Sequence, residues 1–120
     1  MKGMPTLRRQ QDLDRVFEAG HWRCLRPVAV GTYHRDDSEP SRFAVVAGKR
    51  IGAAVRRNRA RRRMREALRG ILPEIREGAD IVLAARSDTV EIDFGALQGA
   101  IRSALEAEGL LVDARQDSPQ

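Results

Sequence analysis

The architecture of this chain follows from residues 49–69, which read KRIGAAVRRNRARRRMREALR. When residues 56–71 are placed on a helix, the apolar side chains gather in a single stripe. The stripe consists of Ala60, Met64, Ala67, Leu68 and Ile71. Arginine occupies most of the other positions. The pattern predicts an amphipathic helix that packs its stripe on a sheet and directs the arginines away from it.

The arginine-rich side of this helix holds the excess positive charge of the chain. Residues 56–69 contain eight arginines and one acid, Glu66, for a net charge of +7. The other fourteen basic and sixteen acidic residues sum to −2, in a chain whose net charge is +5. Arginines three or four positions apart repel one another, and bound phosphates would turn this repulsion into attraction. A polyanionic partner is therefore predicted, with Arg61 and Arg63 laying their stems beside the stripe and their guanidinium groups outward. The expected RNA-binding residues are Arg56, Arg57, Asn58, Arg59, Arg61, Arg62, Arg63, Arg65 and Arg69.

The segments around this helix predict two further helices and several strands. Residues 11–19 have an amphipathic helical pattern, with Asp12 as a candidate cap and Gly20 as a stop. Strand patterns cover about 27–34, within the partly alternating segment 22–34, and then 42–48 and the apolar run 81–85. Residues 94–108 again repeat apolar side chains at helical spacing. The predicted order is roughly α-β-β-β-α-β-α, an α+β two-layer sandwich with the basic helix crossing one sheet face.

Length and composition narrow the class of protein. The 120 residues and 42% apolar content predict one domain, residues 1–112, which contains the polyanion-binding helix and is followed by a disordered tail at 113–120. No apolar run approaches the roughly 18 residues that span a bilayer, and the polar start does not resemble a secretory signal. Cys24 is the only cysteine, which excludes an internal disulfide and a cysteine-based zinc cluster and predicts a cytoplasmic location.

The sequence contains no convincing catalytic or metal-binding group, so no catalytic residue and no cofactor bound by the protein is expected. A metal nuclease needs clustered carboxylates or histidines. His21 and His34 stand apart in the sequence and are interpreted as surface residues. Two acidic clusters are interpreted as solvated loops, namely Asp36, Asp37 and Glu39 in one and Asp88, Glu91 and Asp93 in the other.

Residues 49–69 also resemble the signature of the bacterial ribonuclease P protein subunit family. That signature has two basic residues, a glycine, an Ala-Val step, an Arg-Asn-Arg run, further basic residues and Arg-Glu. The matching residues are Lys49, Arg50, Gly52, Ala54, Val55, Arg57, Asn58, Arg59, Arg61, Arg62, Arg65 and Glu66. Segments 7–20, 41–52 and 78–86 resemble the family's first helix, the strand before the motif and the late strand. The similarity covers most of residues 7–110.

This resemblance implies a ribosomal protein S5 domain 2-like fold, with a left-handed βαβ crossover at the basic helix. It also implies the non-catalytic protein subunit of an endoribonuclease that removes the 5′ leader from precursor tRNA. The ribonuclease P RNA would perform the Mg²⁺-dependent cleavage. The Arg-Asn-Arg helix would bind that RNA, and a cleft between the first helix and the sheet would hold the single-stranded leader. No protein partner is predicted.

The leader cleft is where the sequence departs from the family pattern. Phe17 matches one family aromatic, but Leu13 stands where a second is common and Gly31 where a strand aromatic is common. Leu13 and Phe17 fit a core role equally well. Tyr33, two residues after Gly31 and on the same strand face, is the candidate substitute. Trp22 and Cys24 are interpreted as packing residues. The expected leader-binding residues are Leu13, Phe17, Tyr33, Lys49, Arg50 and Arg86.

Three other functions share part of this pattern. A ribosomal protein or another structured-RNA-binding protein would have the arginine helix without the ordered run from Lys49 to Glu66. A protein-only nuclease would cleave without any RNA. A sequence-specific DNA-binding helix would need more base-reading side chains than the single amide of Asn58.

Overall fold

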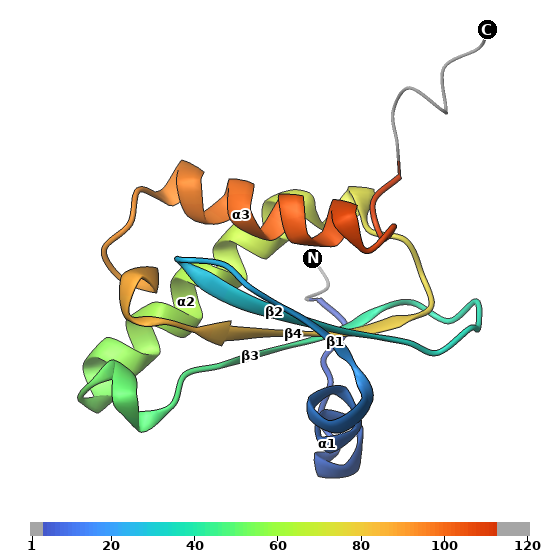
Figure 1. Ribbon diagram of the computed structural model, residues 1–120, viewed down its shortest axis with the longest axis horizontal. Coiled ribbons are helices and arrows are strands. Elements are labelled where there is room, and N and C mark those ends of the chain that lie inside the picture. Colours follow the sequence, from blue (N-terminus) through green and yellow to red (C-terminus); the bar gives the residue numbers. More distant parts are fainter. Residues whose placement is uncertain (1–3, 113–120) are drawn as a thin grey trace, which may run out of the picture.

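The computed structural model describes residues 4–112, in which three α-helices surround one four-stranded sheet (Figure 1). Residues 1–3 and 113–120 lie outside the described part, and so does the predicted disordered tail. The order of elements agrees with the sequence-based prediction. The elements are α1 (Gln10–Ala19), β1 (His21–Cys24), β2 (Val28–His34), β3 (Arg42–Val46), η1 (Lys49–Ile51), α2 (Ala54–Ile71), η2 (Leu72–Glu74), β4 (Ala79–Ala85), η3 (Ser87–Thr89) and α3 (Phe94–Ala107), where η marks a 3₁₀ turn.

The strands are ordered β1-β2-β4-β3, so the apolar run at 81–85 belongs to an inner strand, β4. β2 pairs antiparallel with β1 and with β4, whereas β3 and β4 are parallel neighbours. Parallel neighbours require a crossover connection, and α2 provides it. The left-handedness of this crossover stays a prediction from the resemblance.

Helices cover both faces of the sheet, as Figure 1 shows. α2 and α3 cover one face, where Ile81 and Leu83 of β4 join the main core. α1 lies on the other face, where Val82 packs with Leu7 and Val16. Successive residues of a strand point to opposite faces, which explains why β4 is apolar at consecutive positions. The predicted α+β sandwich therefore carries a third, partial layer formed by α1.

The core stripe of α2 is confirmed, because all five predicted residues are 0% exposed. α2 begins at Ala54, two residues before the predicted start, and ends at Ile71. Pro73 follows in η2. Proline has no N–H with which to continue a helix, so the chain leaves α2 through a 3₁₀ turn.

The predicted cap of α1 is wrong. α1 begins after Arg9, whose side chain makes no capping hydrogen bond. Asp12 lies inside the first turn, where it is buried. It accepts hydrogen bonds from Arg15 at 3.0 Å and from Arg42 at 3.3 Å. Hydrogen bonds between two ionised groups are stronger than those from neutral backbone N–H groups, so the carboxylate faces the arginines.

Candidate RNA interface

Three arginines form the exposed centre of the charged side of α2. Arg59, Arg62 and Arg65 are exposed. Within residues 4–112, the side-chain hydrogen bonds and ion pairs of α2 involve its other residues and leave these three unpaired. Side chains three positions apart share one side of a helix. Unneutralised guanidinium groups arranged in this way suit a row of phosphates, which they can engage through two parallel hydrogen bonds each.

Four other arginines of α2 are held by nearby partners. The contacts are Arg56 with the Glu91 carboxylate at 3.2 Å, Arg57 with the Gly52 carbonyl at 2.9 Å, Arg61 with the Asn58 side chain at 2.9 Å and Arg69 with the Glu66 carboxylate at 2.6 Å. Two of these contacts, Arg56 with Glu91 and Arg69 with Glu66, are exposed ion pairs, which contribute at most about 1 kcal/mol each. An RNA phosphate can therefore replace these two carboxylates at small cost. The structure brings the predicted RNA-binding set together along one helix.

Arg63 is directed differently from the sequence-based expectation. Its guanidinium donates hydrogen bonds to the carbonyl oxygens of Val90 and Ile92, in the segment between β4 and α3. A planar guanidinium can satisfy two neighbouring carbonyls at once, which explains why it lies along the protein instead of pointing outward. Arg63 therefore anchors this segment to α2.

A second candidate surface lies on the α1 face, where Phe17 and Trp22 stack. Their ring centroids are 5.0 Å apart and their planes differ by 25°. Phe17 is 51% exposed, and the Trp22 indole N–H donates to the Val16 carbonyl at 3.0 Å. Trp22 of β1 pairs with Gly31 of β2. A Cβ atom at Gly31 would lie only 2.4 Å from the indole, so the indole occupies the space that a side chain there would need.

The interpretation of Trp22 as a packing residue is therefore incomplete. The Trp22 indole, from the neighbouring strand, lies where a side chain at Gly31 would lie. The sequence held a signal, a glycine and a tryptophan on two adjacent strand segments. To predict that Trp22 lies beside Gly31, one must know which residues of β1 and β2 pair. The sequence pattern does not determine this pairing, because β1 is short and mostly exposed.

Leu13 and Tyr33 contribute more to the packing of this face than to its surface. Both are half-buried and contact the cluster of Leu7, Val16 and Val82. The guanidinium carbon of Arg15 lies 4.9 Å from the centroid of the Tyr33 ring. A ring covered by a cation offers less of its face to a base. The Phe17–Trp22 pair is thus the more accessible aromatic surface.

The basic residues predicted for the leader lie beyond one end of the parallel strands. Lys49 and Arg50 follow β3, Arg86 follows β4, and all three are exposed. The pairing of Val46 with Ala84 places these strand ends at the same edge of the sheet. The structure therefore brings the three cations to one edge, whereas the aromatic pair lies over the middle of β2.

A cavity along β3 lies between α1 and α2. Leu13 of α1 and Arg65 of α2 both line it, together with Ala44 and Val46 of β3. Arg65 is the only charged residue that lines this cavity, so a phosphate could be neutralised only at its α2 side.

Buried ion pairs hold α1 and β3 on the sheet. Asp80 of β4 is 0% exposed and accepts hydrogen bonds from Arg35 at 2.5 Å and from Arg42 at 2.8 Å. The hydrogen bond with Asp80 raises the pKa of Arg42. Arg15 of α1 lies 3.7 Å from Asp80, and Arg42 also reaches Asp12. Sequence analysis missed this network because 38 and 45 residues separate Asp80 from Arg42 and Arg35.

His21 and His34 are exposed, as the sequence analysis predicted, but they do not stand apart, because both lie beside Glu108. His21 Nδ1 and His34 Nε2 lie 3.4 and 3.6 Å from Oε1 of Glu108, just after α3. Arg23 donates to Oε2 of the same carboxylate at 2.9 Å. Burial of Glu108 opposes its ionisation, but Arg23 and His21 outweigh this and lower the pKa of Glu108. The group links α3 to β1 and β2.

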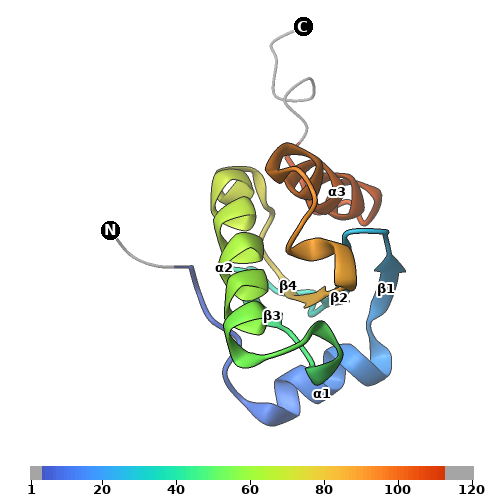
Figure 2. The same cartoon turned by 90° about the vertical axis from the view of Figure 1, so that its left-hand side faces the viewer.

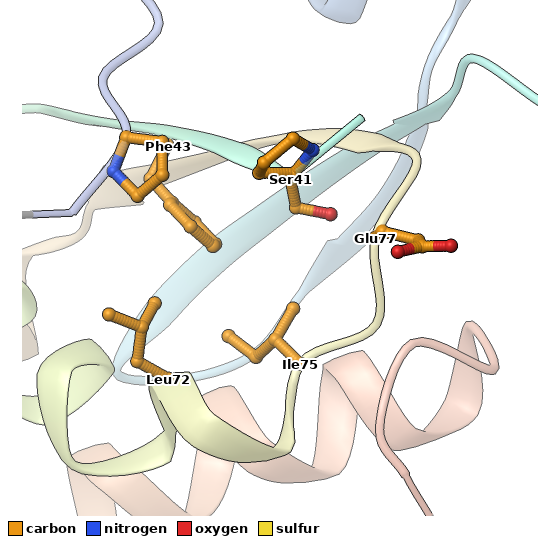
Figure 3. Close-up of a pocket in the computed structure, with 7 residues that line it drawn as sticks. Ser41, Phe43, Leu72, Ile75 and Glu77 are labelled. Carbon is orange, nitrogen blue, oxygen red and sulfur yellow. The ribbon is translucent and has the colours of Figure 1, made fainter. Parts of the chain in front are cut away.

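A further cavity, between η2 and the start of β3, lacks the charge of an RNA site. Figure 3 shows Phe43, Leu72 and Ile75 around it, with Glu77 at its rim. Glu77 is its only charged lining residue, and a carboxylate repels phosphate. Within residues 4–112, no group of His, Cys, Asp and Glu side chains is arranged to hold a metal ion. None of the helices in that range is both long and apolar enough to cross a membrane.

Comparison with known proteins gives one consistent result. A family model described as Ribonuclease P matches residues 1–108. The ribonuclease P protein component of Symbiobacterium thermophilum is 33% identical over 111 residues, which cover 92% of this chain and 96% of that protein. That of Oceanobacillus iheyensis is 30% identical over 115 residues, covering 96% and 95%. The solved ribonuclease P protein of Thermotoga maritima has a TM-score of 0.74 and 25% identity, covering 85% of this chain and 96% of that one.

Proposed function

This chain belongs to the ribonuclease P protein family, and from that premise we propose how it serves the tRNA-processing ribonucleoprotein of which that family is the protein component. The family assigns it to an endoribonuclease and implies the ribonuclease P RNA as its partner. In our proposal, α2 binds this RNA and the α1 face binds the 5′ leader of precursor tRNA. The protein performs no bond cleavage itself.

The unpaired arginines of α2 support the assignment of the RNA-subunit contact. Arg59, Arg62 and Arg65 present three positive charges, and Glu66, the one acid within α2, already pairs with Arg69. Each phosphate that these side chains neutralise releases counterions from the RNA. The affinity of this contact should therefore fall steeply as salt increases.

The Phe17–Trp22 stack is the single observation that best supports a leader-binding role for the α1 face. Aromatic side chains stack on unpaired bases of any sequence, with about 1–3 kcal/mol for each base. A leader varies in sequence between precursors, so stacking suits it better than base-specific hydrogen bonds. Lys49, Arg50 and Arg86 would contact its phosphates at the edge of the sheet.

The chemistry of cleavage is assigned to the RNA subunit and its Mg²⁺ ions. In a protein, metal-assisted hydrolysis needs clustered carboxylate or histidine ligands. The residues assigned here to RNA contact are basic, aromatic or amide-bearing, which suits binding and neutralisation of charge. We place this activity in the cytoplasm, consistent with the single, exposed Cys24.

Cleavage of a precursor tRNA at near-physiological Mg²⁺ tests the proposal. Three reactions are compared: the protein alone, a bacterial ribonuclease P RNA alone, and the two together. Strong leader removal is expected only in the mixture. The variant with Arg59, Arg62 and Arg65 changed to alanine should lose this stimulation. A matched control with Arg26, Arg76 and Arg102 changed to alanine removes the same charge away from the exposed side of α2 and breaks only exposed contacts, so it should keep the stimulation.

Other outcomes would redirect the assignment. Cleavage by the protein alone would make it a protein-only nuclease. No stimulation, with an RNA that is active with its own protein, would favour a structured-RNA-binding protein without a role in cleavage. Equal losses in the two triple variants would show that total charge, and not its place on α2, controls the interaction.

A further inference from the structure

Phe94 is an exposed aromatic residue that none of the assignments above explains. It is the first residue of α3, and it is 42% exposed. Within residues 4–112, the other large apolar side chains that are exposed are Phe17, in the aromatic pair, and Val55, at the start of α2. An apolar ring that is exposed to water beside a charged functional surface indicates an interaction site.

Phe94 lies next to the arginines of α2. It lines a surface hollow with Arg59, Arg62, Arg63 and Glu66. Figure 2 faces this end of the molecule, where the segment leading from η3 into α3 runs beside α2. The hollow therefore has one aromatic wall from α3 and a basic wall from α2.

Several contacts hold the backbone around Phe94 in place relative to the arginines. Arg63 ties the preceding segment to α2 through the carbonyls of Val90 and Ile92. The Asp93 side chain accepts a hydrogen bond from the backbone N–H of Ala96 at 3.1 Å and so fixes the start of α3. A segment whose backbone is already fixed loses little conformational freedom on binding, which favours a specific contact.

The hollow matches the chemistry of a nucleotide with an unpaired base. A base is planar and stacks on a phenyl ring, and its phosphate suits the unpaired guanidinium groups of Arg59 and Arg62. The one acid of the hollow, Glu66, is paired with Arg69 at 2.6 Å. An apolar protein segment would instead bury unpaired cations, at a high desolvation cost.

We propose that Phe94 stacks on an unpaired base of the RNA subunit while Arg59 and Arg62 hold the adjacent phosphates. This inference rests on the proposed function of α2 and deepens it. The hollow lies on the side of the sheet opposite to the Phe17–Trp22 pair. The two exposed phenylalanines therefore serve two different RNA segments, Phe94 the RNA subunit and Phe17 the leader.

The first test measures the Kd between the protein and ribonuclease P RNA at several salt concentrations. Phe94→Ala should weaken binding roughly tenfold, within the roughly five- to hundredfold range of base stacking. Phe94→Trp should keep the affinity, whereas Phe94→Leu should not, because leucine is apolar without a π face. The dependence of log Kd on log salt should be unchanged in these variants. Arg62→Ala should lower its slope by about one, as the loss of a phosphate contact does.

The matched control is Phe17→Ala, the other exposed phenylalanine. It should leave the Kd for the RNA subunit unchanged and reduce the advantage of precursor tRNA over leaderless tRNA in binding to the assembled ribonucleoprotein. Phe94→Ala should raise the Kd for the RNA subunit. When enough of this variant is added to assemble all of the RNA, the advantage of precursor tRNA over leaderless tRNA should be unchanged. Thermal melting of each variant checks that the fold is intact.

A direct reading comes from Trp22→Phe/Phe94→Trp, in which the only indole is at position 94. Its fluorescence should be quenched when the RNA subunit binds. Binding of Phe94→Ala within twofold of the parent, or full recovery by Phe94→Leu, overturns the proposal for Phe94. If Arg62→Ala still weakens binding in that case, the function assigned to α2 stands. If neither variant affects binding and the mixture cleaves no precursor, both proposals fail.

Discussion

Asp80 is the residue on which the α1 face depends most, because it is a fully buried carboxylate among three arginines. The side chain of Arg35 is only 10% exposed, so removal of its partner leaves a poorly hydrated cation. Removing one partner of a buried ion pair typically lowers the free energy of unfolding by about 3–5 kcal/mol. We expect Asp80→Asn to lower the free energy of unfolding by roughly 3 kcal/mol, measured by urea denaturation.

Asp88→Asn is the control for this prediction. Asp88 pairs with Arg26 at 3.0 Å, but the two side chains are 42% and 87% exposed. Pairs exposed to this degree contribute about 0–1 kcal/mol. A similar loss in both variants would mean that burial does not set the strength of the Asp80 network.

Gly31 determines where the indole of Trp22 lies. A methyl group at Gly31 would come within 2.4 Å of that indole, closer than carbon atoms approach. Gly31→Ala should displace the ring, destabilise the fold by about 1–3 kcal/mol and break the stack with Phe17. Trp22 is the only tryptophan of the chain, so its fluorescence should shift towards that of a solvated indole. An unchanged spectrum with an unchanged Tm would show that the strands adjust without moving the ring. The double variant Gly31→Ala/Trp22→Ala should recover part of the lost stability, because it removes the clash.

At the level of elements, α2 is predicted well by sequence and α1 less well. The stripe from Ala60 to Ile71 depends only on helical spacing, which is local, so every one of its residues is found in the core. The prediction for Arg63 was wrong because its partners are carbonyls 27 and 29 residues away. The cap at Asp12 was wrong for the same reason, since Arg42 lies 30 residues away. Local periodicity reveals which face is buried, whereas contacts between elements decide where a polar side chain points.

The end of α3 is joined to β1 and β2 through Glu108, and this junction should respond to acid. Arg23 and His21 overcome the effect of burial and lower the pKa of Glu108 below its ordinary value of 4.5. A carboxyl group whose pKa is lower in the folded state stabilises the fold above its unfolded pKa. That stabilisation disappears as pH falls through the folded pKa. Stability should therefore decline below about pH 4.5.

The variant Glu108→Gln separates this contribution from those of Asp37 and Glu74. The pKa values of Asp37 and Glu74 are also lowered, by hydrogen bonds from Arg35 and Arg102 respectively. Glu108→Gln should have a lower Tm than the parent at pH 7 and a similar Tm at about pH 3. If the two curves of Tm against pH run parallel, Glu108 makes no pH-dependent contribution.

At the scale of the whole molecule, the charge is divided between a segment of net +7 at 56–69 and a remainder of net −2. Folding gathers the arginines of that segment on one helix, where they repel one another. Anions that bind the folded state more tightly than the unfolded chain relieve this repulsion and stabilise the fold by mass action. The free protein should therefore melt several degrees higher in sulfate than in sodium chloride of equal ionic strength.

Equal ionic strength keeps screening constant, so a difference in Tm reports on anion binding. Sulfate also stabilises proteins in general because it is excluded from their surfaces. The variant with Arg59, Arg62 and Arg65 changed to alanine distinguishes the two effects. Its Tm in chloride should be higher than that of the parent, because three mutually repelling charges have been removed. Sulfate should raise its Tm by less than it raises that of the parent. Circular dichroism melting curves of both proteins provide the measurement. Equal Tm values with and without sulfate in the parent protein would exclude anion-dependent stability. Equal increases in Tm in both proteins would mean that sulfate acts by its exclusion from the protein surface and not by binding to α2.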